Sequence, residues 1–216
     1  MSTSAGTTPA PQYASPVDYD TYGPYGPGRG FDPGQKWQRP RYRFQGRITA
    51  DGSVDLYPEP LRPDIDAVNS RVYQTVNDGP YRVAGAATRE DYEKLRQAMI
   101  ATLAALDQRL AGRRLLFGGE ITEADVRLWP TLARFDTGYN PMAGVSERPL
   151  TDLVNLWGYA RDLYQRPAFR DTTDFSSFGG LVRGPKPTFL NDGPWRIKVE
   201  PRLGDWDEPP GRERLG

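Results

Sequence analysis

The sequence predicts an all-α fold, a helical bundle with long irregular arms at its N- and C-terminal ends. In the middle of the chain apolar residues recur every three or four positions, the spacing of an amphipathic helix. Residues typical of helix N-caps precede these stretches, whereas proline and glycine gather toward both ends. We therefore expect four regions: a flexible arm over 1–35, an extended lead-in over 36–62, a helical domain over 63–178 and an irregular arm over 179–216.

The arm over 1–35 is rich in proline, glycine and tyrosine. Such a segment buries too little apolar surface to offset the entropy lost on ordering, so we expect it to be flexible. Its tyrosines leave open an alternative in which the arm wraps over the helical domain. The lead-in alternates aromatic and basic residues without a helical period, which indicates extended chain.

The first predicted helix covers "PDIDAVNSRVYQTVND", with Pro63 in its first turn and one apolar face formed by Ile65, Val68, Val72 and Val76. The second begins after the cap residue Thr88 and ends near Gly112. A fourth helix, over about 151–165, turns Leu156, Trp157 and Ala160 inward and stops before Pro167.

The third predicted helix follows Thr122, and Asp125 three residues later makes a capping box that uses Asp in place of Glu. We interpret Thr122 and Asp125 as a structural cap. The predicted buried face consists of Val126, Trp129, Leu132 and Ala133, and Pro130 should kink the helix or strain its first hydrogen bonds.

The composition excludes several classes of function. The 216 residues carry 28 Lys+Arg against 28 Asp+Glu, so no basic excess attracts a nucleic acid. No run of about eighteen apolar residues predicts a membrane span. The N-terminus lacks the charged and apolar regions of a secretory signal, so we expect a cytoplasmic protein.

The sequence contains neither cysteine nor histidine. This excludes disulfides, thiolate chemistry and cysteine-ligated zinc, and it removes the commonest general base. We expect no cofactor and no metal. Any chemistry has to use Asp, Glu, Tyr, Lys, Arg, Ser or Thr.

Three stretches occur in order at suitable spacing: "LYPEPLRPDIDAVNSRVYQTVNDGPYRVAGAAT", "FGGEITEADVRLWPTLARFD" and "NLWGYARDLYQRPAFRDTTDF". They resemble the C-terminal helical domain of glutathionyl-hydroquinone reductases, the Xi class of the glutathione transferase superfamily. The resemblance implies a glutathione-transferase C-terminal-like bundle over 63–178 and a homodimer. The family's thioredoxin-like domain, with its Cys-Pro-Trp motif, would fall where Ser53 runs almost directly into Asp55.

The resemblance also implies site residues, although it identifies no catalytic one. Tyr81 matches a family tyrosine that contacts the quinone, and Tyr139 matches an aromatic position near the substrate; each could instead be an ordinary packing or loop tyrosine. Arg134 and Asp136 are further catalytic candidates, with a structural ion pair or a cap of a following turn as the alternative. Trp129 is a substrate-binding candidate whose helical spacing favours the core.

Three hypotheses for function follow. Reductive deglutathionylation needs a thiolate, so we reject the family's activity for this chain. The first hypothesis is a glutathione-independent enzyme that isomerises, cyclises or dehydrates a quinone-like or polycyclic aromatic molecule in secondary metabolism. The second is a protein that binds such a molecule without transforming it. The third is a helical interaction module for a partner chain.

Overall fold

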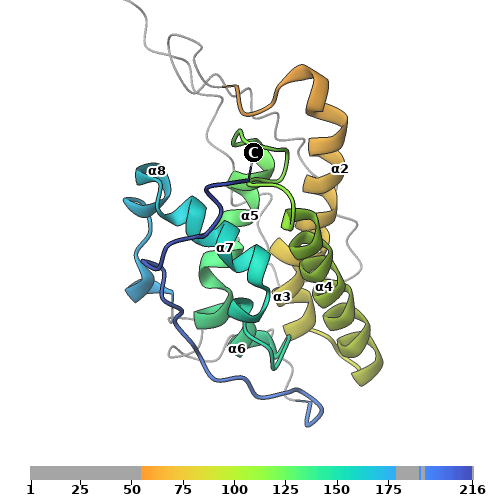
Figure 1. Ribbon diagram of the computed structural model, residues 1–216. Helices are drawn as coiled ribbons and strands as arrows, with labels where there is room; N and C mark the ends of the chain where they lie inside the picture. The colour runs from red at the N-terminus through yellow and green to blue at the C-terminus, as the bar shows by residue number, and fades with distance from the viewer. Residues whose placement is uncertain (1–54, 179–189, 191–192, 216) are drawn as a thin grey trace, which may run out of the picture. The chain divides into compact units, whose positions relative to one another are not determined.

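A computed structural model describes residues 55–178, 190 and 193–215 of the protein (Figure 1). The predictions for 1–35, for 36–54 and for 179–189 therefore lie outside the described residues. The predicted all-α fold is confirmed: within the described ranges the regular structure is helical and includes no β-strand, although an isolated bridge pairs Leu115 with Gly118.

The longer helices correspond to the predicted ones, and several short elements lie between them. The order is η1 (Glu59–Leu61), α2 (Arg62–Val72), η2 (Tyr73–Asn77), α3 (Gly79–Ala84), α4 (Arg89–Leu110), α5 (Glu123–Arg134), η3 (Phe135–Tyr139), α6 (Asn140–Ala143), η4 (Leu150–Asp152), α7 (Val154–Tyr164), α8 (Pro167–Arg170) and η5 (Phe175–Ser177). Two of these, η2 and η3, are π-helical turns that the sequence analysis did not predict.

The helix starts follow the predicted chemistry. Pro63 lies in the first turn of α2, where a missing backbone N–H costs nothing. Thr88 caps α4, because its side chain accepts a hydrogen bond from the Asp91 N–H at 3.1 Å. Pro130 lies inside α5, and the helix continues past it to Arg134 before the backbone changes to the π-helical turn η3.

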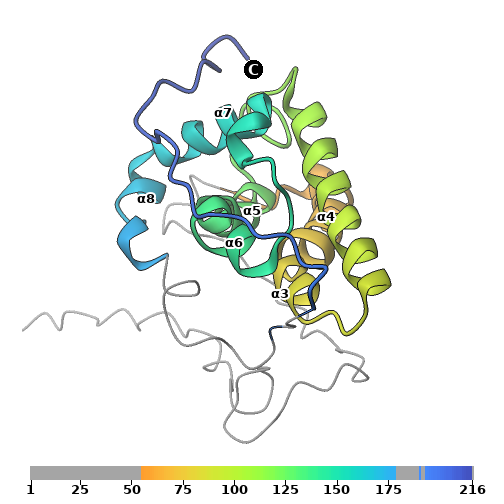
Figure 2. The ribbon, with the colours of Figure 1, turned by 90° about the horizontal axis from the view of Figure 1, so that it is seen from below.

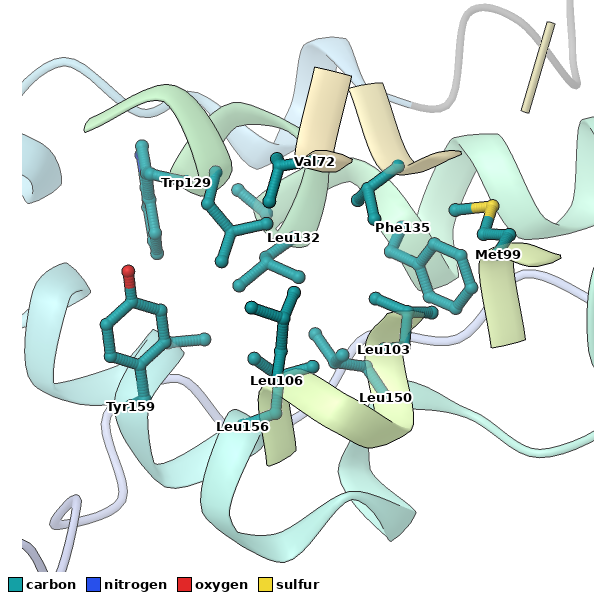
Figure 3. Packing of buried hydrophobic residues seen from close by; sticks show 14 of the residues in the cluster. Val72, Met99, Leu103, Leu106, Trp129, Leu132, Phe135, Leu150, Leu156 and Tyr159 are labelled. Atoms are coloured by element: carbon teal, nitrogen blue, oxygen red, sulfur yellow. The ribbon is translucent and has the colours of Figure 1, made fainter. Parts of the chain in front are cut away.

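The core forms where α4, α5 and α7 meet (Figure 3). Leu106, Leu132 and Leu156, one from each helix, are almost completely buried. Most of α5 is enclosed, which is expected for the central helix of a bundle. The prediction that Val126 belongs to its buried face is wrong: Val126 is 40% exposed, because the enclosed arc of α5 runs through Asp125, Leu128 and Leu132 and leaves Val126 on the outer side.

An aromatic cluster occupies one part of the core. Its centre is Trp206, whose ring lies 4.6 Å from the ring of Trp157 and 5.6 Å from that of Trp129, centroid to centroid. Stacked and edge-to-face contacts of this kind add to the energy of burial. Trp206 comes from the C-terminal arm, so this arm contributes to the core of the helical domain.

Residues 193–215, here called the C-terminal strap, contain no helix but run along the bundle (Figures 1 and 2). The Ile197 N–H donates to the Tyr92 hydroxyl at 3.0 Å, and that hydroxyl donates to the Gly144 carbonyl at 2.5 Å. Further along, the buried guanidinium of Arg212 donates to the Leu110 carbonyl at 2.7 Å and to the Asn155 carbonyl at 3.1 Å. Arg212 thereby satisfies a carbonyl at the end of α4 that has no partner within the helix.

Glycines make room for the strap. A Cβ at Gly144 would lie 2.5 Å from the Ile197 carbonyl oxygen, and one at Gly158 would lie 2.9 Å from the Pro210 carbonyl oxygen. Within the strap, a Cβ at Gly204 would lie 2.6 Å from the ring of Trp157. The fit between strap and bundle therefore depends on the absence of side chains at three separate positions.

Among the described residues no helix combines the length and the apolar character needed to cross a membrane.

Candidate functional site

The structure brings Tyr81 and Tyr139 together from segments 58 residues apart. Their hydroxyl oxygens are 3.4 Å apart, and the rings meet edge to face at 70° with centroids 5.6 Å apart. Both side chains are partly buried, so their rings pack on the core while part of each remains accessible. Of the residues predicted for substrate binding, these two form a common site, here called the tyrosine pair.

Irregular helical turns position both tyrosines. Tyr139 is the last residue of the π-helical turn η3, and Tyr81 lies in α3, which begins two residues after the π-helical turn η2 ends. π-Helical turns are rare and occur frequently at functional sites. They carry no recognised sequence pattern, so the sequence analysis had no signal for them.

Close backbone approach fixes the turn beside Tyr139. A Cβ at Gly138 would lie 2.8 Å from the backbone oxygen of Phe178, so only glycine fits there without displacement. On the preceding helix turn, the guanidinium carbon of Arg134 lies 4.4 Å from the centroid of the Phe178 ring. Arg134 also donates to the Pro130 carbonyl at 3.0 Å. The candidate Arg134 is thus held against an aromatic ring by a cation–π contact.

Asp136 caps a following turn, which is one of the two structural alternatives predicted for it. Its carboxylate accepts from the Leu150 N–H at 2.8 and 3.1 Å, and Leu150 is the first residue of η4. Among the described residues it forms no salt bridge with Arg134. Burial raises the pKa of Asp136 to about 6, against the opposing effects of the Leu150 N–H and the Arg202 charge.

Trp129 does not join the tyrosine pair. It is 7% exposed and lies in the aromatic cluster, with ring contacts to Tyr164, Phe169 and Trp206. Figure 3 shows it among the core side chains. Trp129 therefore lies in the core, as its helical spacing indicated.

Thr122 and Asp125 form the predicted capping box at the start of α5. The Asp125 carboxylate accepts from the Thr122 N–H at 2.8 Å and from the Thr122 hydroxyl at 2.9 Å. It also accepts from the Leu116 N–H at 3.1 Å and from the Tyr159 hydroxyl at 2.9 Å, two partners that the sequence analysis missed. Burial raises the pKa of Asp125 although all four hydrogen bonds oppose the shift.

A polar hollow of about 370 Å³ lies near the C-terminal end of α7, and none of its lining residues belongs to the tyrosine pair. Its charges largely satisfy one another: Arg114 donates to both carboxylate oxygens of Asp162, at 2.7 and 3.0 Å. Arg166 approaches the same carboxylate at 3.7 Å. We interpret the charged residues that line this hollow as a structural ion-pair network.

The chemistry available at the tyrosine pair is that of two phenols. Each hydroxyl can donate and accept a hydrogen bond, and each ring offers a face or an edge to another aromatic system. Over the described residues no cluster of three or more His, Cys, Asp or Glu side chains could hold a metal ion.

Comparison with known proteins agrees with this architecture. Residues 89–162 match the family model described as glutathione S-transferase, C-terminal domain. The chain is 37% identical over 164 residues to glutathionyl-hydroquinone reductase YqjG of Escherichia coli (strain K12), a match that covers 74% of this chain and 48% of the relative. It is 45% identical over 102 residues to glutathionyl-hydroquinone reductase PcpF of Sphingobium chlorophenolicum, covering 47% of this chain and 33% of the relative.

Solved structures show the same likeness. The Xi-class glutathione transferase from Natrialba magadii superimposes with a TM-score of 0.67 at 31% identity, over 76% of this chain and 49% of that one. The chain thus spans about half the length of these relatives or less. Residues 89–162 thus match a glutathione S-transferase C-terminal domain, and the helical part of the chain is similar to glutathionyl-hydroquinone reductases and Xi-class transferases.

Proposed function

We propose that this chain binds a quinone-like or other polycyclic aromatic molecule at the tyrosine pair. The observation that carries the proposal is the meeting of the Tyr81 and Tyr139 hydroxyls at 3.4 Å on two partly buried rings. A quinone or phenol presents ring oxygens and an aromatic plane. Two phenol hydroxyls side by side can bond such an oxygen while the rings contact the plane.

Two further observations support an aromatic ligand. The relatives YqjG and PcpF are named as glutathionyl-hydroquinone reductases, so a quinone-related molecule is the natural ligand class to test first. The tyrosine pair also lies beside two π-helical turns, η2 and η3, a type of irregularity that is common at functional sites.

The proposed chemistry does not use glutathione. The sequence has no cysteine, so this chain supplies no thiolate for reductive deglutathionylation. We propose instead that it catalyses proton transfer, that is an isomerisation, cyclisation or dehydration of the bound molecule, as in secondary metabolism. A tyrosine hydroxyl can exchange a proton with a substrate oxygen, and the site can accelerate the step by holding a reactive molecule in one conformation.

Ligand titration tests the proposal. We would purify the full chain from its own host, record its native mass with any co-purifying small molecule, and then titrate it with menadione as a quinone probe. We expect Tyr81→Phe and Tyr139→Phe each to weaken binding about three- to tenfold, the effect of losing one hydrogen bond.

The matched control is Tyr73→Phe, which changes an exposed tyrosine on the other π-helical turn, η2, and should leave the affinity unchanged. Equal affinity in all four proteins would refute binding at the tyrosine pair. Tight binding without conversion of any co-purified aromatic would favour a carrier. A native mass that contains a second polypeptide and no small molecule would favour an interaction module.

A further inference from the structure

The π-helical turn that carries Tyr139 is fastened on both sides of that residue. Asp136, three residues before it, holds the Leu150 N–H through its carboxylate and the Arg202 N–H, at 3.0 Å, through its main-chain oxygen. Asn140, the next residue after Tyr139, is buried and accepts from the Ser146 N–H at 2.9 Å. The contacts of Asp136 connect η3 to η4 and to the C-terminal strap. The contact of Asn140, the first residue of α6, connects the position after Tyr139 to the loop between α6 and η4.

We infer that Asp136 is the positioning residue of the tyrosine pair: by joining η3 to Leu150 and to the C-terminal strap, it sets where the Tyr139 hydroxyl lies relative to Tyr81. This inference deepens the proposed function and rests on it as far as ligand binding is concerned. Its structural half, the dependence of Tyr139 on Asp136, can be tested without any ligand.

A positioning role fits the contacts better than a catalytic one. Both carboxylate oxygens of Asp136 face the Leu150 N–H, and no hydrogen bond of this carboxylate to Tyr81 or Tyr139 occurs among the described residues. Asp136 therefore acts on Tyr139 indirectly, through the backbone of η3 and through its side-chain hydrogen bond with Asn140, the residue after Tyr139. The turn is short, and Gly138 is wedged against the Phe178 backbone, so a shift at Asp136 has little room to be absorbed before Tyr139.

The connection should respond to pH. The charged groups that face Asp136 from the packed elements are Arg202 of the C-terminal strap, which favours its ionised form, and Asp152 of η4, which opposes it. Burial outweighs the attraction of Arg202, so the pKa of Asp136 is about 6. Above that pH the carboxylate is a strong charge-assisted acceptor for the Leu150 N–H, and below it the neutral acid is a weaker one.

Fluorine NMR of the full chain measures the effect directly. We would place 3-fluorotyrosine at position 139 and follow its resonance from pH 4.5 to pH 7, below the range in which the fluorinated phenol itself ionises. The wild-type resonance should move with a midpoint of about 6. Asp136→Asn, which keeps an acceptor oxygen but cannot ionise, should give a resonance that stays constant over this range. Asp136→Ala should displace the resonance at every pH.

Two controls guard the result. 3-Fluorotyrosine at position 73 should show no midpoint near 6, because Tyr73 lies on a different π-helical turn. Asp174→Asn is the matched variant, since Asp174 also caps a short helical turn through the Ser176 N–H, at 2.9 Å, and its loss should leave the pH response of the resonance at position 139 unchanged.

The outcomes separate the inference from the proposed function. A wild-type Tyr139 resonance that does not titrate, or one that titrates equally in Asp136→Asn, would overturn the positioning role. A titrating resonance together with no menadione binding would leave the positioning role standing and reject the proposed ligand. If Asp136→Ala does not fold, the comparison of wild type with Asp136→Asn decides alone.

Discussion

An aspartate lies at each end of α5, the buried Asp125 in its first turn and the half-buried Asp136 two residues past its last residue, and the two are used differently. At the N-terminal end Asp125 accepts four hydrogen bonds, from Thr122, Leu116 and Tyr159. Beyond the C-terminal end the Asp136 carboxylate has two partners, the Leu150 N–H and the side chain of Asn140. Asp125 has its lone pairs occupied by four donors and serves the fold, whereas Asp136 has fewer donors and burial raises its pKa to about 6, so that its proton occupancy changes near neutral pH.

We expect the largest effect on stability from removing the Asp125 carboxylate at the N-terminal end of α5. Asp125→Ala leaves two backbone N–H groups and a buried tyrosine hydroxyl without their acceptor. Because such a network fails as a unit, we expect the free energy of unfolding to fall by about 3–5 kcal/mol in urea denaturation. Asp125→Asn keeps one acceptor oxygen and should lose less. A loss below about 1 kcal/mol for Asp125→Ala would show that the network contributes little.

Gly138→Ala tests the packing at the other end of α5. The added methyl would lie 2.8 Å from the Phe178 backbone oxygen, so the backbone has to move, and we expect a cost of about 1–3 kcal/mol in the same denaturation experiment. Gly112→Ala is the control, because no atom lies within 4 Å of the position of its Cβ. That variant should be neutral or slightly stabilised. Equal effects at Gly138 and Gly112 would remove the evidence that η3 is tightly wedged.

The smallest effect concerns the pH dependence of stability at Asp136. Its pKa in the folded state, about 6, exceeds the usual 3.8, so the folded protein holds this proton more tightly than the unfolded chain does. The resulting stabilisation is complete below the unfolded pKa and is lost as the pH rises through 6.

Asp136→Asn stays neutral at every pH, so its stability relative to wild type should increase by about 1 kcal/mol between pH 5 and pH 7. Thermal unfolding of both proteins across this range gives the difference. A difference that is constant with pH would mean that Asp136 is ionised throughout this range, and would contradict the raised pKa.

The same contrast explains what the sequence could predict. The capping box of Thr122 and Asp125 was predictable because its residues are three apart and the chemistry is local. The hydrogen bond from the Tyr159 hydroxyl to Asp125 was not predictable, since Tyr159 lies 34 residues away and nothing local indicates the contact. Likewise, the sequence did not show whether Asp136 caps a turn or forms an ion pair. Its hydrogen-bond partner, Leu150, lies 14 residues later in a separate short helical turn.

The tyrosine pair falls between these cases. The family resemblance indicated Tyr81 and Tyr139 separately, but their contact depends on two π-helical turns that have no sequence pattern. Val126 shows the limit of periodicity: a helix enclosed over a wide arc has no narrow apolar stripe, so a residue at the edge of the stripe can fall outside it.

The C-terminal strap has a consequence for how the chain acquires its structure during synthesis. The Arg212 guanidinium meets the Leu110 carbonyl across 102 residues, and the Ile197 N–H meets Tyr92 across 105. The ribosome therefore synthesises every helix of the bundle before it reaches the strap. Until then the end of α4 and the aromatic cluster around Trp157 remain open to water and to other nascent chains. Contacts of such long range form slowly, so the docking of the strap should be a late step of folding. The bundle without its docked strap is then the species that we expect a chaperone to bind most.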